Sequence, residues 1–261
     1  MKRSTRRRLT RGFFYALLAG AVALLAMIAD REAITSNYFD MDVWARMWPT
    51  VVTLGIKNTL KLTALSFAGG LVLGLLLALM RLSPIAPYRW LATGWIEFFR
   101  GLPALVVILF VAFAIPIAFQ WRPPGGSTGA GVIALIAVSS AYLAETIRAG
   151  IQAVPKGQVE AARSLGMKPG PTMGFVVLPQ AFRIVIPPLT NEFVLLLKDT
   201  SLLAFAGILV QDRELTTLAR DFSSQYSNAS PYVVVALAYL AVTLPLTQLV
   251  SYLERRQQKA R

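Results

Sequence analysis

The sequence predicts an all-α, polytopic membrane protein with about six transmembrane helices. Of its 261 residues 56% are hydrophobic, and the mean hydropathy is +0.58. This composition is too apolar for an ordinary soluble domain. The charged residues lie in clusters between long apolar runs. Apolar runs of about 20 residues with charged segments between them are typical of helices that cross a bilayer.

The polar residues exclude several kinds of chemistry. The chain has no cysteine and no histidine, so we expect no disulfide, no catalytic residue and no metal site. It contains no Gly-x-x-x-x-Gly-Lys-Ser/Thr phosphate loop, so any ATP that drives the protein must bind to another subunit. The net charge of +13 is typical of nucleic-acid binding proteins as well. Its one-sided distribution, described below, favours contact with membrane lipid and no nucleic acid partner.

Residues 1–48 are expected to form a basic N-terminus, one transmembrane helix and an external loop. Six lysine or arginine residues precede residue 12, and an uncharged run from Gly12 to Ala29 follows them. Eighteen residues are barely enough to cross a bilayer. A cleaved secretory signal would have the same pattern, but we expect a retained helix. Residues 30–48 are polar and aromatic, which indicates the loop.

Residues 49–253 are expected to form one transmembrane domain, followed by a basic tail over residues 254–261. Within the domain, Gly70 and Gly74 form a Gly-x-x-x-Gly step that would let another helix approach closely. Polar connections are predicted at residues 81–100, 120–129, about 150–186, and 211–230. The predicted spans are Pro49–Met80, Gly101–Trp121, Ala130–Ala144, Pro187–Val210 and Pro231–Leu253.

The distribution of basic residues predicts the orientation in the membrane. The two termini and the two connections on their side of the membrane hold eighteen lysine and arginine residues, whereas the opposite connections hold five. Cytoplasmic segments carry the excess of such residues in membrane proteins. We therefore expect a multi-pass protein with both termini, and the connection at about 150–186, in the cytoplasm.

This last connection contains a short polar helix between Pro155 and Gly166. Proline suits the start of a helix, and glycine suits the position just after its end. A rod of about ten residues measures roughly 15 Å, too short to cross a bilayer. Lys156, Glu160 and Arg163 share one face of it. The pattern predicts a helix that protrudes and docks into a partner, although a solvated helix with ordinary charge pairs would also show it.

Four segments in the same order resemble the inner-membrane permease subunits of ABC importers. Glu160-Ala161-Ala162, then Gly166, then Val176, Leu178 and Pro179 resemble the "EAA" coupling loop of that family. The segments Glu97–Pro103, Ala144–Gly157 and Leu197–Leu202 are similar to the branch that imports polar amino acids such as histidine, arginine, glutamine or glutamate. The resemblance extends from Pro49 to the C-terminus, so the N-terminal helix is additional to a five-helix type I permease core.

The resemblance implies a partner for each face of the protein. Glu160, Ala161, Ala162 and Gly166 would dock into a cytoplasmic dimer of ABC ATPase subunits, which binds ATP and Mg, while this chain binds no cofactor. A second permease subunit, identical or homologous, would complete the pathway. An extracytoplasmic binding protein would deliver the amino acid, and ATP-driven closure would move it by alternating access across a bacterial cytoplasmic membrane. The particular amino acid is not indicated.

The fifth predicted span carries polar residues that must avoid lipid. Asn191, Glu192, Lys198 and Asp199 lie within it, and each charge at bilayer depth costs at least about 2.5 kcal/mol. Residues seven apart share a stripe of a helix, so the two acids could hold a substrate ammonium group. The resemblance implies that Lys198, Asp199, Thr200 and Ser201 border the pathway. Alternatively, the charges pair with Arg148, Lys57 or Lys61 and hold the bundle together.

Two other functions share the overall composition. An ion-coupled secondary transporter could use Glu192 and Asp199 for coupling, but the sequence has no inverted repeat and does have a coupling loop. A membrane scaffold or sensor subunit would need no polar lining. The sequence therefore favours the ATP-driven importer.

Overall fold

The protein is helical throughout the part that a computed structural model describes, residues 3–258, without the side chains of residues 3–10, 25, 257 and 258. This confirms the predicted all-α class. The α-helices are α1 (Arg3–Ile28), α2 (Arg31–Tyr38), α3 (Met41–Thr50), α4 (Lys57–Leu82), α5 (Ala86–Gly101), α6 (Ala104–Leu109), α7 (Ile115–Phe119), α8 (Gly126–Gln152), α9 (Lys156–Ser164), α10 (Pro169–Pro171), α11 (Leu178–Asp199), α12 (Leu215–Tyr226) and α13 (Ser230–Gln258). Three π-helical segments join some of them: η1 (Val51–Ile56), η2 (Phe110–Ala114) and η3 (Thr172–Val177). Two 3₁₀ helices follow α11: η4 (Thr200–Phe205) and η5 (Val210–Asp212).

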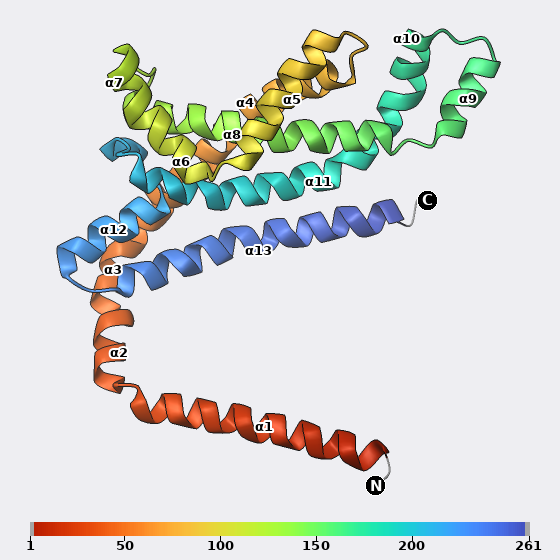
Figure 1. Ribbon diagram of the computed structural model, residues 1–261. Coiled ribbons are helices and arrows are strands. Elements are labelled where there is room, and N and C mark those ends of the chain that lie inside the picture. Colours follow the sequence, from red (N-terminus) through yellow and green to blue (C-terminus); the bar gives the residue numbers. More distant parts are fainter. Residues whose placement is uncertain (1–2, 259–261) are drawn as a thin grey trace.

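The long helices form the bundle that positions the sites. Five helical segments among the described residues are long and apolar enough to cross a membrane, or six if the bent pair α5 and α6–α7 is one span. Helices α4, α8 and α11 pack together, and α13 lies along α11 (Figure 1). The two termini and α9 lie toward the same end of the molecule (Figure 1). This arrangement agrees with an even number of crossings, and the assignment of that end to the cytoplasm remains a prediction from the charges.

The contact between α4 and α8 is the most extensive in the bundle, and the predicted glycine step lies within it. A Cβ atom on Gly70 would lie 2.2 Å from Oγ of Ser139, and one on Gly74 would lie 3.0 Å from the carbonyl oxygen of Ser140. Both distances are shorter than a van der Waals contact. The prediction that Gly70 and Gly74 form a packing seam is therefore confirmed.

Three segments predicted as connections are helical instead. Residues 30–48 form α2 and α3, residues 81–100 are mostly α5, and residues 211–230 contain α12. For α2 and α3, the residues that indicate a helix are the N-terminal caps. Asp30 accepts a hydrogen bond from the amide of Ala33 at 3.0 Å, and Asp40 accepts one from the amide of Asp42 at 3.0 Å. Polar composition alone does not distinguish a loop from a surface helix with such caps.

The third predicted span, Gly101–Trp121, corresponds to the segment Ala104–Phe119, and it begins just after a sharp bend. The chain turns by 105° between α5 and the segment Ala104–Phe119, at Leu102-Pro103. Proline removes a backbone donor and disfavours a helical conformation in the residue before it. The apolar run that begins at Gly101 therefore does not continue the direction of α5.

The fourth and fifth spans are displaced from their predicted bounds. Helix α8 continues to Gln152 because the charges expected to end it, Glu145 and Arg148, pair with each other. Helix α11 begins at Leu178 and contains Pro187 and Pro188 in its interior, where the sequence predicted a start. Prolines are tolerated inside transmembrane helices when neighbouring groups satisfy the freed backbone. The helix ends at Asp199, and η4 replaces its expected continuation to Val210.

Candidate functional site

The short helix α9 stands on a small apolar base. Val154, Val177 and Ala181 are buried together, and Ile151 and Val159 pack against them. Helix α9 ends in a left-handed glycine, since Gly166 has φ +82°. The amide of Met167 donates to the carbonyl of Ala162 at 3.1 Å, which closes the last turn. The predicted helix between Pro155 and Gly166 is confirmed.

The predicted coupling residues do not all face the same way. Glu160 and Ala161 are exposed, and the neighbouring Leu165 is 85% exposed. Ala162 is only 5% exposed and faces its own chain. We define the docking face as Glu160, Ala161 and Leu165, because these side chains are free to meet a partner. The expectation that Ala162 lies on the exposed knob is wrong for this structure.

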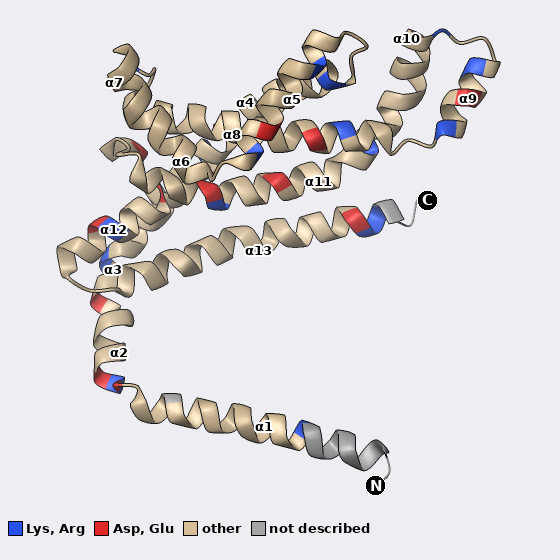
Figure 2. Cartoon of the chain, viewed as in Figure 1, with Lys and Arg blue, Asp and Glu red and all other residues tan. Residues whose placement is uncertain are grey.

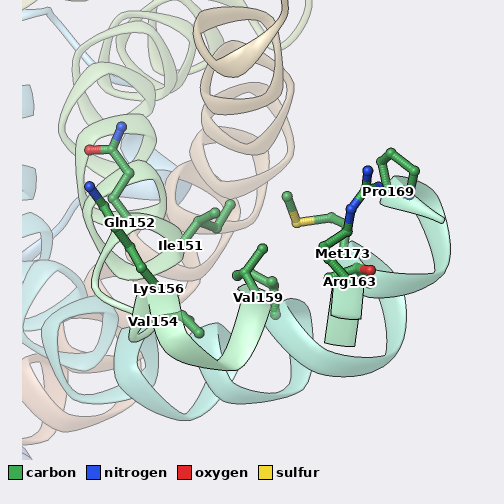
Figure 3. A pocket seen from close by; sticks show the side chains of 10 residues that line it. Ile151, Gln152, Val154, Lys156, Val159, Arg163, Pro169 and Met173 are labelled. Atoms are coloured by element: carbon green, nitrogen blue, oxygen red, sulfur yellow. The ribbon is translucent and has the colours of Figure 1, made fainter. Parts of the chain in front are cut away.

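A groove of about 760 Å³ lies between α9, the end of α8 and the turn η3. Val159 lies at its centre (Figure 3). Lys156 and Gln152 lie on one side of it, and Arg163 lies on the other beside Met173 (Figure 3). The lining is largely apolar, and its charged members are both basic.

A second, much smaller cavity lies inside the bundle between α11, α8 and α4. Glu192 and Asp199 of α11 line it, together with Ser139 and Tyr142 of α8 and Phe67 of α4. Its volume is about 30 Å³, which holds a water molecule but not an amino acid. The predicted stripe of two acids thus lines one small cavity, most of whose other lining side chains are apolar.

The other four residues predicted for the pathway lie elsewhere. Asn191 and Lys198 are exposed on the outside of α11 and do not line the cavity. Thr200 is fully buried, and its hydroxyl donates to the carbonyl of Leu197 at 2.7 Å. Ser201 is half-buried in η4. The structure therefore brings together two of the six predicted residues, Glu192 and Asp199.

The sequence did not indicate the partners that α4, α5 and α8 supply to this cavity. Ser139 and Tyr142 interrupt an otherwise apolar run, which was the available signal. The guanidinium carbon of Arg100 lies 5.7 Å from the centre of the Tyr142 ring, so α5 brings a positive charge close to the cavity. The spacing of residues 67, 100 and 142 along the sequence does not indicate that they lie near α11. Their proximity to α11 depends on how the four helices α4, α5, α8 and α11 pack.

An ion-paired cluster, formed by Arg81, Glu97, Glu145 and Arg148, joins α4, α5 and α8. Arg81 bonds to Glu145, and Arg148 Nη2 lies 2.7 Å from Glu145 Oε2. Arg81 Nη2 also lies 3.6 Å from Glu97 Oε1. Figure 2 shows the charges of α8 and α11 along the two helices. Glu145 thus holds two arginines from two helices.

The alternative that the charges of α11 pair with other helices is not supported. Arg148 pairs with Glu145, and Lys61 pairs with Asp212 at 3.3 Å. None of the ion pairs among the described side chains involves Glu192 or Asp199. Nor do the described residues contain a group of three or more metal-binding side chains. The two acids therefore face a cavity instead of a basic partner.

Glu214 is a buried carboxylate that the sequence did not single out. It caps α12, accepting from the amides of Thr216 at 2.6 Å and Thr217 at 2.7 Å. The Tyr239 hydroxyl donates to it at 3.2 Å. Burial raises the pKa of the Glu214 carboxyl above its ordinary value, although these donors oppose the shift. Glu214 ties α12 to α13.

Known proteins share both the sequence and this architecture. A probable glutamine ABC transporter permease protein, GlnM, of Bacillus subtilis (strain 168) is 42% identical over 208 residues, covering 79% of this chain and 93% of that protein. The L-cystine transport system permease protein TcyB of the same organism is 38% identical over 211 residues, covering 80% and 87%.

A solved structure described as an amino acid ABC transporter with histidines shares 40% identity with this chain. The two superpose with a TM-score of 0.75 over 82% of this chain and 96% of that one. A bacterial alginate ABC transporter matches the fold alone, at 15% identity and a TM-score of 0.66, over 98% of this chain. Residues 70–259 match the family described as the inner membrane component of binding-protein-dependent transport systems. The chain therefore belongs to this family of ABC importer permeases, and it is a transport subunit, not an ATP-hydrolysing enzyme.

Proposed function

We propose that the chain is the transmembrane subunit of an ATP-driven importer that moves a polar amino acid by alternating access. The relatives named above support this substrate class, since their names refer to glutamine, cystine and an amino acid transporter with histidines. Family membership leaves the secondary transporter and the scaffold without support.

The observation that carries the coupling part of the proposal is the docking face of α9. Its apolar base fixes the helix to α8 and α11, while Leu165 is left 85% exposed on the other side. An exposed apolar side chain on a fixed helix is a suitable contact for a partner. A cytoplasmic dimer of ATPase subunits, carrying ATP and Mg, would press on this face and move α8 and α11 together.

The small cavity beside Glu192 and Asp199 is the proposed substrate contact. At about 30 Å³ it is closed to an amino acid, so we propose that the described conformation is one in which the site is collapsed. Separation of α11 from α8 during the transport cycle would open it. The acids would then face the ammonium group, while Arg100 would lie near the carboxylate. A second permease subunit and an extracytoplasmic binding protein would complete the pathway.

Uptake in proteoliposomes tests the proposed function. The chain would be reconstituted with its ATPase subunit, and accumulation of labelled glutamine, cystine or histidine would be measured in the presence of the binding protein. We expect uptake that requires enclosed ATP and persists without an ion gradient. Uptake that follows a proton or sodium gradient without ATP would overturn the proposal.

The coupling face is tested by Gly166→Arg. A Cβ atom added at Gly166 would have open space around it, but the backbone φ of +82° at this position is unfavourable for residues other than glycine. We expect normal membrane insertion, loss of ATPase assembly and loss of stimulated hydrolysis, because the end of α9 unwinds. Lys168→Gln, in the same loop but outside α9, is the control and should assemble normally. Wild-type hydrolysis by Gly166→Arg would refute docking through this face.

The orientation is tested by labelling from outside. Arg122 is exposed between α7 and α8, at the end of the bundle opposite α9. A cysteine there should react with an impermeant thiol reagent in intact cells, and a reporter after Arg261 should be cytoplasmic. Labelling of residue 122 only after membrane rupture would reverse the proposed topology.

A further inference from the structure

The segment that follows α11, residues 200–209, closes the small cavity at one end. It begins with η4, which packs against α4, α6, α8 and α12. Leu203 and Ala206 are fully buried in one apolar cluster with Val138 and Leu196. The last two residues also line the cavity, so this cluster lies directly against it. Helix α8 begins here, and its 27 residues extend about 40 Å to the end beside α9 (Figure 1). The segment therefore closes the cavity on the side opposite α9.

A glycine of α8 makes room for η4. A Cβ atom on Gly131 would lie 2.5 Å from Cδ2 of Leu203, so the leucine occupies the space of the missing side chain. Helix α4 meets α8 in the same way, since a Cβ atom on Gly69 would lie 2.5 Å from Cδ1 of Ile136. The two contacts differ in extent. Helices α4 and α8 share the most extensive contact in the bundle, whereas η4 contacts α8 over a short stretch.

Side chains of α8 hold the end of this segment by hydrogen bonds to its backbone. The Ser127 hydroxyl donates to the carbonyl of Gly207. The amide of Leu209 donates to the Thr128 hydroxyl oxygen at 3.0 Å. We call Ser127 and Thr128 the latch. A neutral hydrogen bond of this kind changes an equilibrium by only about fivefold, so a latch of two such bonds can break and form again within a transport cycle.

We propose that η4 is the outer gate of the transport pathway. Leu203 closes the gate by its contact with Gly131, and the latch holds the closed state. When Leu203 leaves Gly131, the cavity opens toward the side of the protein opposite α9, while α4 and α8 stay together. The gate rests on the proposed importer function, to which it adds the element that closes the substrate contact on the side away from the ATPase subunits.

Two matched cysteine pairs test whether η4 moves. The chain contains no cysteine, so each pair reacts without background. Gly131→Cys with Leu203→Cys joins α8 to η4, and Gly69→Cys with Ile136→Cys joins α8 to α4. Each pair would be bridged by a short, reducible bifunctional thiol reagent in the permease–ATPase complex in proteoliposomes. We expect the first bridge to abolish ATP-driven uptake until a reductant is added, and the second to leave uptake at its value before bridging.

A single cysteine in the cavity tests the latch. Ser139 lines the cavity and is 8% exposed, so Ser139→Cys should react slowly with an impermeant thiol reagent added from outside. Ser127→Ala with Thr128→Val removes both bonds of the latch and should raise this reaction rate about 25-fold, at about fivefold for each bond. Thr247→Val removes a hydroxyl that bonds within α13. It is the control and should leave the rate unchanged.

Three results would overturn the gate. Uptake that continues after the bridge between residues 131 and 203 has formed would show that η4 does not move. Loss of uptake with both bridges would assign the effect to α8 as a whole. An unchanged reaction rate at residue 139 without the latch would show that Ser127 and Thr128 do not hold the cavity closed, and this measurement needs neither bridge.

The importer function is decided separately, by the unbridged wild-type complex. ATP-driven uptake by that complex, together with uptake through both bridged pairs, would remove the gate and leave the importer standing. Uptake by the wild-type complex without ATP would remove the importer, and with it the transport role of the gate. The reaction rate at residue 139 would then still decide whether the latch closes the cavity.

Discussion

Two groups of charged side chains in the same bundle differ in their surroundings: one is ion-paired, and the other lines a cavity. In the ion-paired cluster, Glu145 is 18% exposed at its side chain and contacts both Arg81 and Arg148. In the cavity of α11, Glu192 and Asp199 have no ion-pair partner among the described side chains and line a space of about 30 Å³. A charge within a membrane must face protein or water. The first group faces protein and ties helices together, whereas the second faces a small cavity.

The largest expected effect comes from Glu145→Gln. The substitution leaves the partly buried Arg81 and Arg148 without their shared carboxylate. We expect a loss of about 3 kcal/mol in the free energy of unfolding, at the lower end for breaking a buried pair because the cluster is partly exposed. Thermal unfolding in detergent measures it. Glu97→Gln removes an acid that is 60% exposed and lies 3.6 Å from Arg81, so it should change stability by less than about 1 kcal/mol. Equal losses in both variants would show that burial does not distinguish them.

An intermediate effect, dependent on pH, is expected at Glu214. Its pKa in the folded protein is raised above 4.5 by burial, so folding favours the neutral form. Its contribution is complete below pH 4.5 and is lost as the pH rises through the raised pKa. Glu214→Gln resembles the neutral acid and should remove this part of the pH dependence. Unfolding temperatures of both proteins between pH 4 and 7 measure it. A wild-type slope that the variant retains would assign the dependence to another group.

The smallest effect on stability is expected for Asp199→Asn, which keeps the shape of the side chain and removes its charge. A carboxylate facing a cavity owes little stability to that charge, so unfolding should change by less than about 1 kcal/mol. Uptake should weaken or change its substrate preference. Lys198→Gln, an exposed neighbour outside the cavity, is the control and should transport normally.

The comparison fails if Asp199→Asn behaves like Glu145→Gln. A strongly destabilised protein, whose folded fraction transports with an unchanged preference, would place Asp199 among the bundle-stabilising charges. Glu192→Gln should be measured beside it, because both acids line the same cavity. A transport defect in Glu192→Gln alone would leave the substrate contact to that residue.

The sequence predicted α9 well because its signals are local. Pro155 and Gly166 act through their own backbone angles, and the polar run between them is too short to cross a bilayer. The limits of α8 and α11 were predicted less well. The charge of Glu145 predicts the end of a span, because its partner Arg81 is 64 positions away and does not show in the local sequence. Pro187 predicts a start, although α11 continues through it.

The sequence by itself determined that the chain is helical, crosses a membrane and carries an importer's motif, and it predicts that the basic residues lie on one side and that α9 belongs to a coupling loop. These properties depend on hydropathy, charge and local backbone preference, which are read within one segment. Only the tertiary structure decided which face of α9 is free, which acids of α11 meet a cavity, and which charges pair. The reason is that burial and pairing depend on side chains from other helices, such as Tyr142 beside Glu192 and Arg81 beside Glu145, and no spacing along the chain encodes those distances.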